Sequence, residues 1–170
     1  MEKKSIIITF IIVFTFIGLL LWGYAKNGNT VASVQGVTKT GAKSELISDI
    51  TINDFGTITM RNGDVSKDFT FTNPTNKDIT INSVETSCMC TKALLVETDG
   101  SIKGPFGMAS MGGNTTTNDI IRAGESRTLR VVYDPNAHGP AGVGQIDRFA
   151  TITDSSGATL QFEIKALVTP

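Results

Sequence analysis

Apolar and polar residues alternate in several short runs from residue 47 to the end of this 170-residue chain. Phe69 and Phe71 are separated by a threonine, and every second residue from Leu160 to Val168 is apolar. Successive side chains of a β-strand point to opposite faces, so this period of two predicts strands with one buried face. No window after Trp22 shows a sustained helical period. The pattern therefore predicts an all-β domain.

Clusters of turn-forming residues separate these runs. Asn73 to Asn76 (NPTN) and Asp154 to Gly157 (DSSG) are two examples. About seven short strands with such turns are typical of a sandwich or a barrel. About 120 residues suffice for one hydrophobic core. We therefore predict one immunoglobulin-like β-sandwich of about seven strands over residues 47–170.

Two stretches do not follow the strand pattern, namely Asp99 to Asp119 and Asp134 to Gly144. Both are rich in glycine and have no sustained alternation. Irregular loops of this length in a compact domain are usually functional or disordered. We expect a functional site, if the domain has one, to lie in these loops.

The N-terminus has the features of a membrane anchor. Residues 6–22 are almost wholly apolar, and about 20 such residues form a helix that spans a bilayer core. Lys3 and Lys4 precede the run and favour a cytoplasmic N-terminus. We favour an uncleaved anchor over residues 1–25 because the run is longer than that of a signal peptide. The alternative is a signal peptide cleaved near Gly23 to Ala25. Both interpretations place the domain on the extracytoplasmic side of the cell membrane.

Residues 26–46 differ in composition from both neighbours. They are rich in glycine, serine, threonine and asparagine, with few large apolar side chains. Such a segment buries little surface and is typical of a flexible linker. We therefore expect a tether between the anchor and the domain.

The charge of the domain bears on its partners. Residues 47–170 contain ten basic and fourteen acidic residues, and they contain no run of Lys or Arg. Binding to nucleic acid needs clustered cations, so we expect no nucleic-acid partner. The sequence does not indicate an oligomeric state.

Cys88 and Cys90 are the only cysteines, two residues apart in the segment SCMCT. In an extended segment their Cα atoms would lie about 6.5–7 Å apart, whereas a disulfide prefers about 5.5–6 Å. We therefore expect the pair to resist closure into a disulfide. Three interpretations stay open: two reduced, half-buried core residues, a strained redox-active pair, or two soft ligands of Cu(I).

Other soft or nitrogen ligands occur in the two irregular stretches. Met108 and Met111 lie in the first one, and His138, the only histidine, lies in the second. Thioether, thiolate and imidazole groups together suit Cu(I). We therefore name Cys88, Cys90, Met108, Met111 and His138 as candidate metal ligands, although the sequence does not show that the loops meet.

No catalytic motif is present. The chain has one histidine, no G-x-S-x-G sequence and no phosphate-binding glycine motif. A Cys–His nucleophile pair would need a third orienting group and a low thiol pKa. We therefore expect a protein that is not an enzyme.

Three segments carry a resemblance to a known family. They are Asp54 to Ile58 (DFGTI), Phe69 to Pro74 (FTFTNP) and Ile81 to Thr91 (INSVETSCMCT), and Ala123 to Ser126 (AGES) follows in the same order. The chain resembles the bacterial envelope family of unknown function with a strand containing phenylalanine and asparagine, an "sCxCt" segment and a "pGe" turn. That family is similar in fold to the domains of major sperm protein and Hydin.

The resemblance covers about Ile50 to Val168, and it implies a sandwich of seven or eight strands without established activity. Met89 stands where the family usually has glycine, and the loop of residues 100–118 is longer than usual. Three functions remain as hypotheses: a non-catalytic binding or scaffolding module, a copper-handling protein, and a thiol-redox protein.

Overall fold

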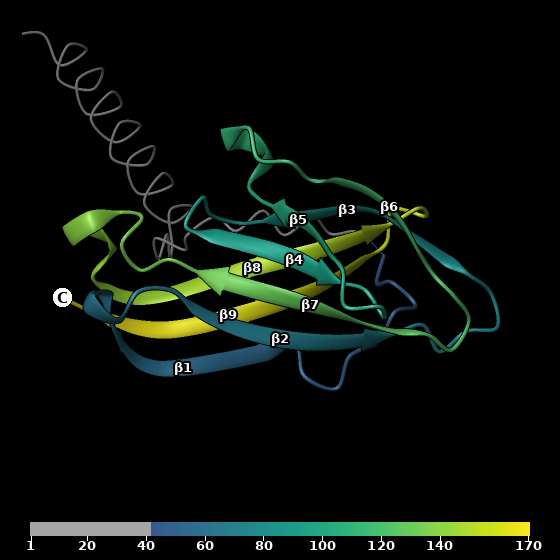
Figure 1. Cartoon of the computed structure of the whole chain (residues 1–170), viewed down its shortest axis with the longest axis horizontal. Helices are drawn as coiled ribbons and strands as arrows, with labels where there is room; N and C mark the ends of the chain where they lie inside the picture. Colours follow the sequence, from purple (N-terminus) through teal and green to yellow (C-terminus); the bar gives the residue numbers. More distant parts are fainter. Residues whose placement is uncertain (1–41) are drawn as a thin grey trace, which may run out of the picture. The chain divides into compact units, whose positions relative to one another are not determined.

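The computed structural model describes residues 42–170, which form a sandwich of two β-sheets (Figure 1). The predicted anchor and residues 26–41 of the predicted linker lie outside the described part. No helix within residues 42–170 is long and apolar enough to cross a membrane.

Nine strands occur in the described part, joined by turns and three short 3-10 helices. The strands are β1 (Ile52–Thr59), β2 (Val65–Thr72), β3 (Ile79–Thr86), β4 (Thr91–Val96), β5 (Ile102–Phe106), β6 (Thr116–Ile121), β7 (Ser126–Tyr133), β8 (Gly144–Asp154) and β9 (Thr159–Thr169). The helices are η1 (Met60–Asn62), η2 (Ala109–Met111) and η3 (Gly139–Gly142).

The order of the strands confirms the predicted sandwich. One sheet has the order β1-β9-β8-β3-β6 and the other has the order β2-β7-β4-β5. The sets β2-β7-β4 and β3-β8-β9 correspond to strands B-E-D and C-F-G of the immunoglobulin topology. Strand β1 lies at the edge of its sheet and pairs in parallel with β9.

The prediction of about seven strands is too low because the stretch from Asp99 to Asp119 contributes two. Strand β5 is largely exposed and contains glycine and proline, so it carries no alternation. Strand β6 does alternate, but its inward residues include the polar Thr117 and Asp119. Neither strand therefore shows the apolar period that marks the others.

The alternation predicts the core correctly on most strands. Phe69 and Phe71 of β2 are buried and face Phe162 of β9, with ring centroids of Phe69 and Phe162 4.9 Å apart. In β3 the register shifts between Ile81 and Ser83. This shift lets Ile81 and Val84 both point inward although they are three residues apart.

The N-terminal edge of the domain differs from the predicted boundary at residue 47. Leu46 is completely buried, and the Ser44 amide donates to the Thr159 carbonyl at 3.0 Å. Ile50 and Ile52, which open the predicted strand series, are instead each 54% exposed. Residues 43–46 therefore belong to the packed domain rather than to a linker.

Candidate functional site

The two cysteines lie in the tight connection between β3 and β4. The amide of Thr91 donates to the carbonyl of Cys88 at 3.1 Å, which closes a turn. Ser87 holds this turn to β8, because its amide donates to the Phe149 carbonyl and its hydroxyl accepts from the Phe149 amide, both at 2.9 Å. The cysteine segment is thus anchored to both sheets.

Cys88 and Cys90 form a disulfide, with their Cα atoms 5.2 Å apart. The expectation that this spacing resists closure is therefore wrong, and so is the interpretation as reduced core residues. It assumed an extended segment, whereas the turn folds the backbone and brings the Cα atoms within disulfide range. Cys90 is 2% exposed and belongs to the core, whereas Cys88 is partly buried at its margin.

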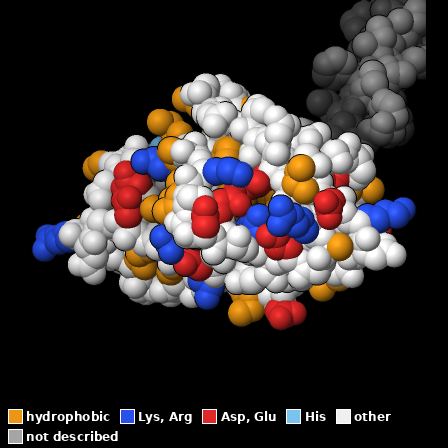
Figure 2. Space-filling model, turned by 45° about the vertical axis from the view of Figure 1, so that its right-hand side comes forward, with side chains coloured by type: hydrophobic (Ala, Val, Ile, Leu, Met, Phe, Trp, Pro, Cys, Tyr) orange, Lys and Arg blue, Asp and Glu red, His pale blue; other side chains and the backbone are white. Residues whose placement is uncertain are grey.

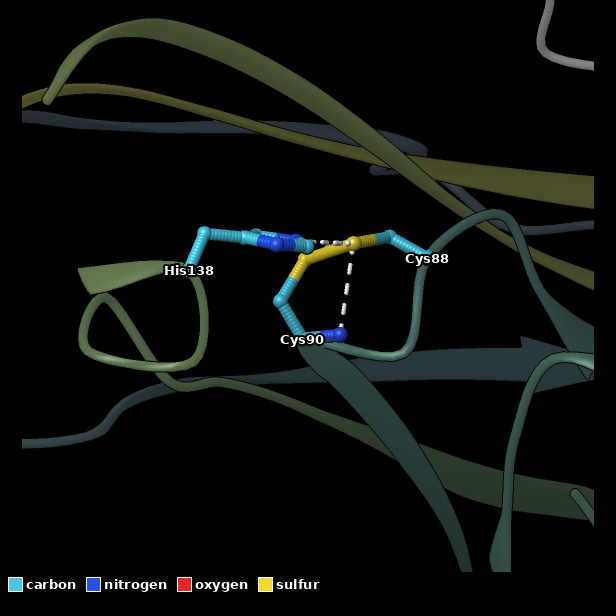
Figure 3. A group of neighbouring side chains, drawn as sticks. All are labelled: Cys88, Cys90 and His138. Atoms are coloured by element: carbon cyan, nitrogen blue, oxygen red, sulfur yellow. Dashed lines mark hydrogen bonds between the residues drawn. A yellow bond between two sulfur atoms is a disulfide. The ribbon is translucent and has the colours of Figure 1, made fainter. Parts of the chain in front are cut away.

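His138 lies beside this disulfide (Figure 3). It is the residue just before η3, in the irregular loop between β7 and β8, and its side chain is exposed. The Nε2 atom of His138 is 3.2 Å from the sulfur of Cys88. The ligand atoms of His138, Cys88 and Cys90 all lie within 4.8 Å of one another. The structure thus brings together three of the five predicted site residues.

Two contacts position the loop that carries His138. The amide of Asp134 donates to the carbonyl of Cys90 at 2.9 Å, and the side chain of Asn136 donates to the carbonyl of Met60 at 2.9 Å. The first of these ties the start of the loop directly to the cysteine segment. The proximity of His138 and Cys88 therefore follows from tertiary contacts, which the sequence does not show.

The two predicted methionine ligands lie in another connection of the fold. Met108 and Met111 lie in the connection between β5 and β6, where Met111 is 61% exposed. The role of these two methionines as metal ligands stays a prediction.

Arg148 is a site residue that the sequence analysis missed. Its Nε donates to the sulfur of Cys90 at 3.3 Å, and its Nη1 donates to the carbonyl of Asp147 at 2.8 Å. Arg148 occupies an inward position of β8, between the buried Ile146 and Ala150. A charged residue in the apolar register of a strand is the signal that would have identified it.

A second group of charged side chains joins the two sheets near β5 and β6. Lys103 is 2.9 Å from Glu97 and 2.7 Å from Asp119, and Arg127 is 3.0 Å from Glu97 and also pairs with Glu125. The hydrogen bonds that Lys103 donates to Asp119 and Glu97 raise the pKa of Lys103. These pairs link β4, β5, β6 and β7, so we interpret them as closing this side of the sandwich.

The surface charge is mixed on the face shown in Figure 2. Lys and Arg side chains lie beside Asp and Glu side chains there, without a large area of one sign. An ion pair at the surface joins Arg130 of β7 to Asp68 of β2, with Nε and Oδ1 2.7 Å apart. This arrangement is typical of a solvated protein surface.

Part of the chain matches the model of one protein family of unknown function. The model of the family described as "Protein of unknown function (DUF1573)" matches residues 46–103, which include the cysteine segment. No curated protein matches the sequence. The matched stretch is about a third of the chain and runs from Leu46 into β5.

Among solved structures, a protein of unknown function from Porphyromonas gingivalis W83 aligns with a TM-score of 0.52 and 16% identity, over 77% of this chain and 50% of its own. The protease VesB of Vibrio cholerae aligns with a TM-score of 0.47 and 17% identity, over 72% of this chain and 32% of its own. The PapD-like domain 7 of human CEP192 aligns with a TM-score of 0.45 and 12% identity, over 81% of this chain and 96% of its own.

The chain thus spans half or less of the first two of these structures. At 16% identity, the likeness to the Porphyromonas protein concerns the fold alone. It agrees with the two-sheet sandwich described above.

Proposed function

We propose that this protein is a membrane-anchored, extracytoplasmic immunoglobulin-like module that binds or scaffolds another envelope protein and has no catalytic activity. The observation that carries this proposal is a group of three exposed isoleucines, called here the isoleucine edge: Ile47, Ile50 and Ile52. They are 48%, 54% and 54% exposed, respectively, although each is a typical core residue.

The isoleucine edge lies where the chain enters β1, the edge strand of the five-stranded sheet. Its backbone is held in place, because the hydroxyl of Ser48 lies 2.6 Å from the carbonyl of Thr70 and 2.9 Å from that of Ile50. Exposed aliphatic side chains on a strand edge favour association and are usually covered by a partner. We therefore assign the contact with the partner to the isoleucine edge.

Charge around the isoleucine edge indicates the chemistry of the partner. Glu45, Asp49 and Asp54 are exposed and are interspersed with the isoleucines along the chain. Acidic groups at the rim of an apolar contact attract basic groups and exclude acidic ones. We therefore expect the partner to present an apolar patch with Lys or Arg at its rim.

Two further observations support the extracytoplasmic location. Lys3 and Lys4 precede the apolar run of residues 6–22, which favours export of the residues C-terminal to the run. The bond between Cys88 and Cys90 is of a kind that persists in oxidising compartments and is rare in the cytoplasm.

The binding proposal is tested by photo-crosslinking in the native cells. A photoreactive amino acid replaces Ile52 in one variant and Ile102 in the control, and both positions lie on edge strands and are 54% exposed. We expect a discrete adduct from position 52 that is lost when Ile50→Lys is added. The same adducts from positions 52 and 102 would contradict the proposal.

A second candidate function is capture of Cu(I), and the proximity of Cys88, Cys90 and His138 favours it. Both sulfurs are bonded to each other here, so thiolate ligation requires prior reduction. We expect the reduced protein to bind about one Cu(I), as thiolate sites prefer this ion.

The test of copper binding is metal analysis under reducing conditions. Cys88→Ser/Cys90→Ser is expected to abolish binding and His138→Ala to weaken it. Met108→Leu/Met111→Leu tests whether the two thioethers take part, in which case binding is weakened. Equal uptake by wild type and the double serine variant would exclude this site.

A further inference from the structure

We propose that the bond between Cys88 and Cys90 is a directional thiol–disulfide exchange site that accepts two electrons from a protein dithiol. In this proposal the incoming thiolate attacks the sulfur of Cys88, and the sulfur of Cys90 is the leaving group. This exchange is a stoichiometric reaction rather than catalytic turnover. It does not depend on the isoleucine edge, which lies in a different part of the chain.

Burial distinguishes the two sulfurs. Cys90 is 2% exposed and packs in the core, whereas Cys88 is partly buried and is followed by Met89, which is 53% exposed. An attacking thiolate must approach in line with the S–S bond, from the side opposite the leaving sulfur. Because Cys90 is the deeper residue, the approach to Cys88 comes from the surface.

Arg148 provides the charge that a leaving thiolate needs. Its Nε lies 3.3 Å from the sulfur of Cys90, and a guanidinium stays protonated at every physiological pH. Hydrogen bonds to an ionised acceptor are roughly twice as strong as neutral ones, so this contact strengthens as the bond breaks.

Arg148 differs from the other two arginines of the sandwich sheets in lacking a carboxylate partner. Arg127 is paired with Glu97 and Glu125, and Arg130 is paired with Asp68. Within residues 42–170, no ion pair includes Arg148. A partly buried guanidinium without a counter-ion is costly. In the reduced protein, the thiolate of Cys90 supplies that counter-ion.

The exchange balances in two steps. First, a thiolate of the substrate dithiol forms a bond to the sulfur of Cys88, and the electron pair of the S–S bond passes to Cys90 as a thiolate. Second, the other substrate thiolate attacks the substrate sulfur of this mixed disulfide and releases Cys88. The substrate is oxidised to a disulfide, and the protein is reduced to the thiolate of Cys90 and the thiol of Cys88. Of the two substrate protons, one passes to Cys88 and the other is released to solvent.

His138 acts on the second step. Its Nε2 is 3.2 Å from the sulfur of Cys88, and in the tautomer with a proton there it donates to that sulfur as Cys88 leaves. The sulfur of Cys88 also accepts from the amide of Cys90 at 3.2 Å. Both sulfurs thus have hydrogen-bond donors, namely Arg148 for Cys90, and His138 with the Cys90 amide for Cys88 (Figure 3 shows the contacts of Cys88).

The direction of attack is tested on the purified full chain with glutathione. After brief exposure to an excess of reduced glutathione, acid quenching and alkylation with a maleimide, both labels are located by fragmenting the peptide that lies between Lys77 and Lys92. We expect glutathione on Cys88 and maleimide on Cys90, in about tenfold excess over the reverse pattern. Equal labelling, or glutathione mainly on Cys90, would overturn the proposal.

The role of Arg148 is tested by the rate of reduction with dithiothreitol. Arg148→Gln is expected to slow reduction about tenfold, as for the loss of one charge-assisted hydrogen bond, and Arg148→Lys is expected to retain part of the rate. Arg130→Gln is the matched control and should match wild type. If Arg148→Gln is reduced as fast as wild type, the proposed leaving-group role is wrong. Should Arg148→Gln not fold, the Arg148→Lys rate and the glutathione map still decide the matter.

Discussion

The hydroxyl of Ser44 donates a hydrogen bond of 2.6 Å to the carboxylate of Asp154, 110 residues later in the chain. Asp154 is 5% exposed and begins the turn between β8 and β9. Its other carboxylate oxygen accepts from the amides of Ser156 and Ala158, at 2.9 and 3.1 Å. One buried carboxylate thus organises the turn and holds the first residues of the domain against it.

Loss of the Ser44 hydroxyl should destabilise the domain. We expect Ser44→Ala to lower the free energy of unfolding by about 1.5–3 kcal/mol, the usual value of a hydrogen bond to a charged group. Urea denaturation of a protein comprising residues 42–170 measures the change. Ser155→Ala in the same turn, where the side chain is exposed, is the control and should change little. Equal effects of the two substitutions would show that the Ser44 bond contributes nothing.

Stability should fall at acid pH through Asp154. Burial raises the pKa of Asp154, but hydrogen bonds from Ser156, Ser44 and Ala158 outweigh it, so the folded pKa is lowered. A lowered folded pKa stabilises the fold fully at pH values above the unfolded pKa of about 3.9. This contribution is lost as the pH falls through the folded pKa. We expect Asp154→Asn to be less stable than wild type at neutral pH, with a difference that shrinks below about pH 4. A constant difference between pH 7 and pH 2 would refute this linkage.

Leu46 tests where the domain begins. Because its side chain is completely buried, Leu46→Ala should cost about 2–5 kcal/mol, as for other leucines in cores. A protein that starts at residue 47 should lose at least as much relative to one that starts at residue 42. Calorimetry of the two proteins measures this. Identical melting temperatures of the two proteins would support the predicted boundary at residue 47.

The alternation of side chains was sufficient to predict the sandwich and most of its core. Strand β9 is the clearest case, because its apolar residues from Leu160 to Val168 face inward as their period requires. Strands β5 and β6 were not predicted, because neither has the apolar alternation of the other strands. Strand β5 is largely exposed and contains glycine and proline. The inward positions of β6 hold the polar residues Thr117 and Asp119, and the charge of Asp119 is compensated by a tertiary contact with Lys103.

The candidate site was predicted in part. Sequence patterns identified Cys88, Cys90 and His138, but not the turn that lets the cysteines bond, since no glycine or proline marks the segment SCMCT. Their proximity depends on hydrogen bonds between segments far apart in the chain, such as that from Asp134 to Cys90. Arg148 was detectable in principle as a charged residue in an inward register.

Two arginines of β7 provide a matched test of ion-pair burial. Arg127 is 8% exposed and faces Glu97, whereas Arg130 and its partner Asp68 are 39% and 48% exposed. Removing one member of a buried pair leaves an uncompensated charge and costs about 3–5 kcal/mol, but an exposed pair contributes at most about 1 kcal/mol. We therefore expect Arg127→Met to be far more destabilising than Arg130→Met in denaturant titrations. Similar losses would mean that the cluster around Glu97 is solvated.

The domain is expected to lie on the extracytoplasmic side of the membrane. A reporter that is active only outside the cytoplasm, fused after the exposed Pro170, should be active in the full chain because Lys3 and Lys4 favour a cytoplasmic N-terminus. Lys3→Glu/Lys4→Glu should reduce that activity. Lys26→Glu lies on the other flank of the apolar run, so it should leave the orientation unchanged. Activity confined to a cytoplasmic reporter would exclude both the proposed location and the oxidising environment in which the exchange site would work.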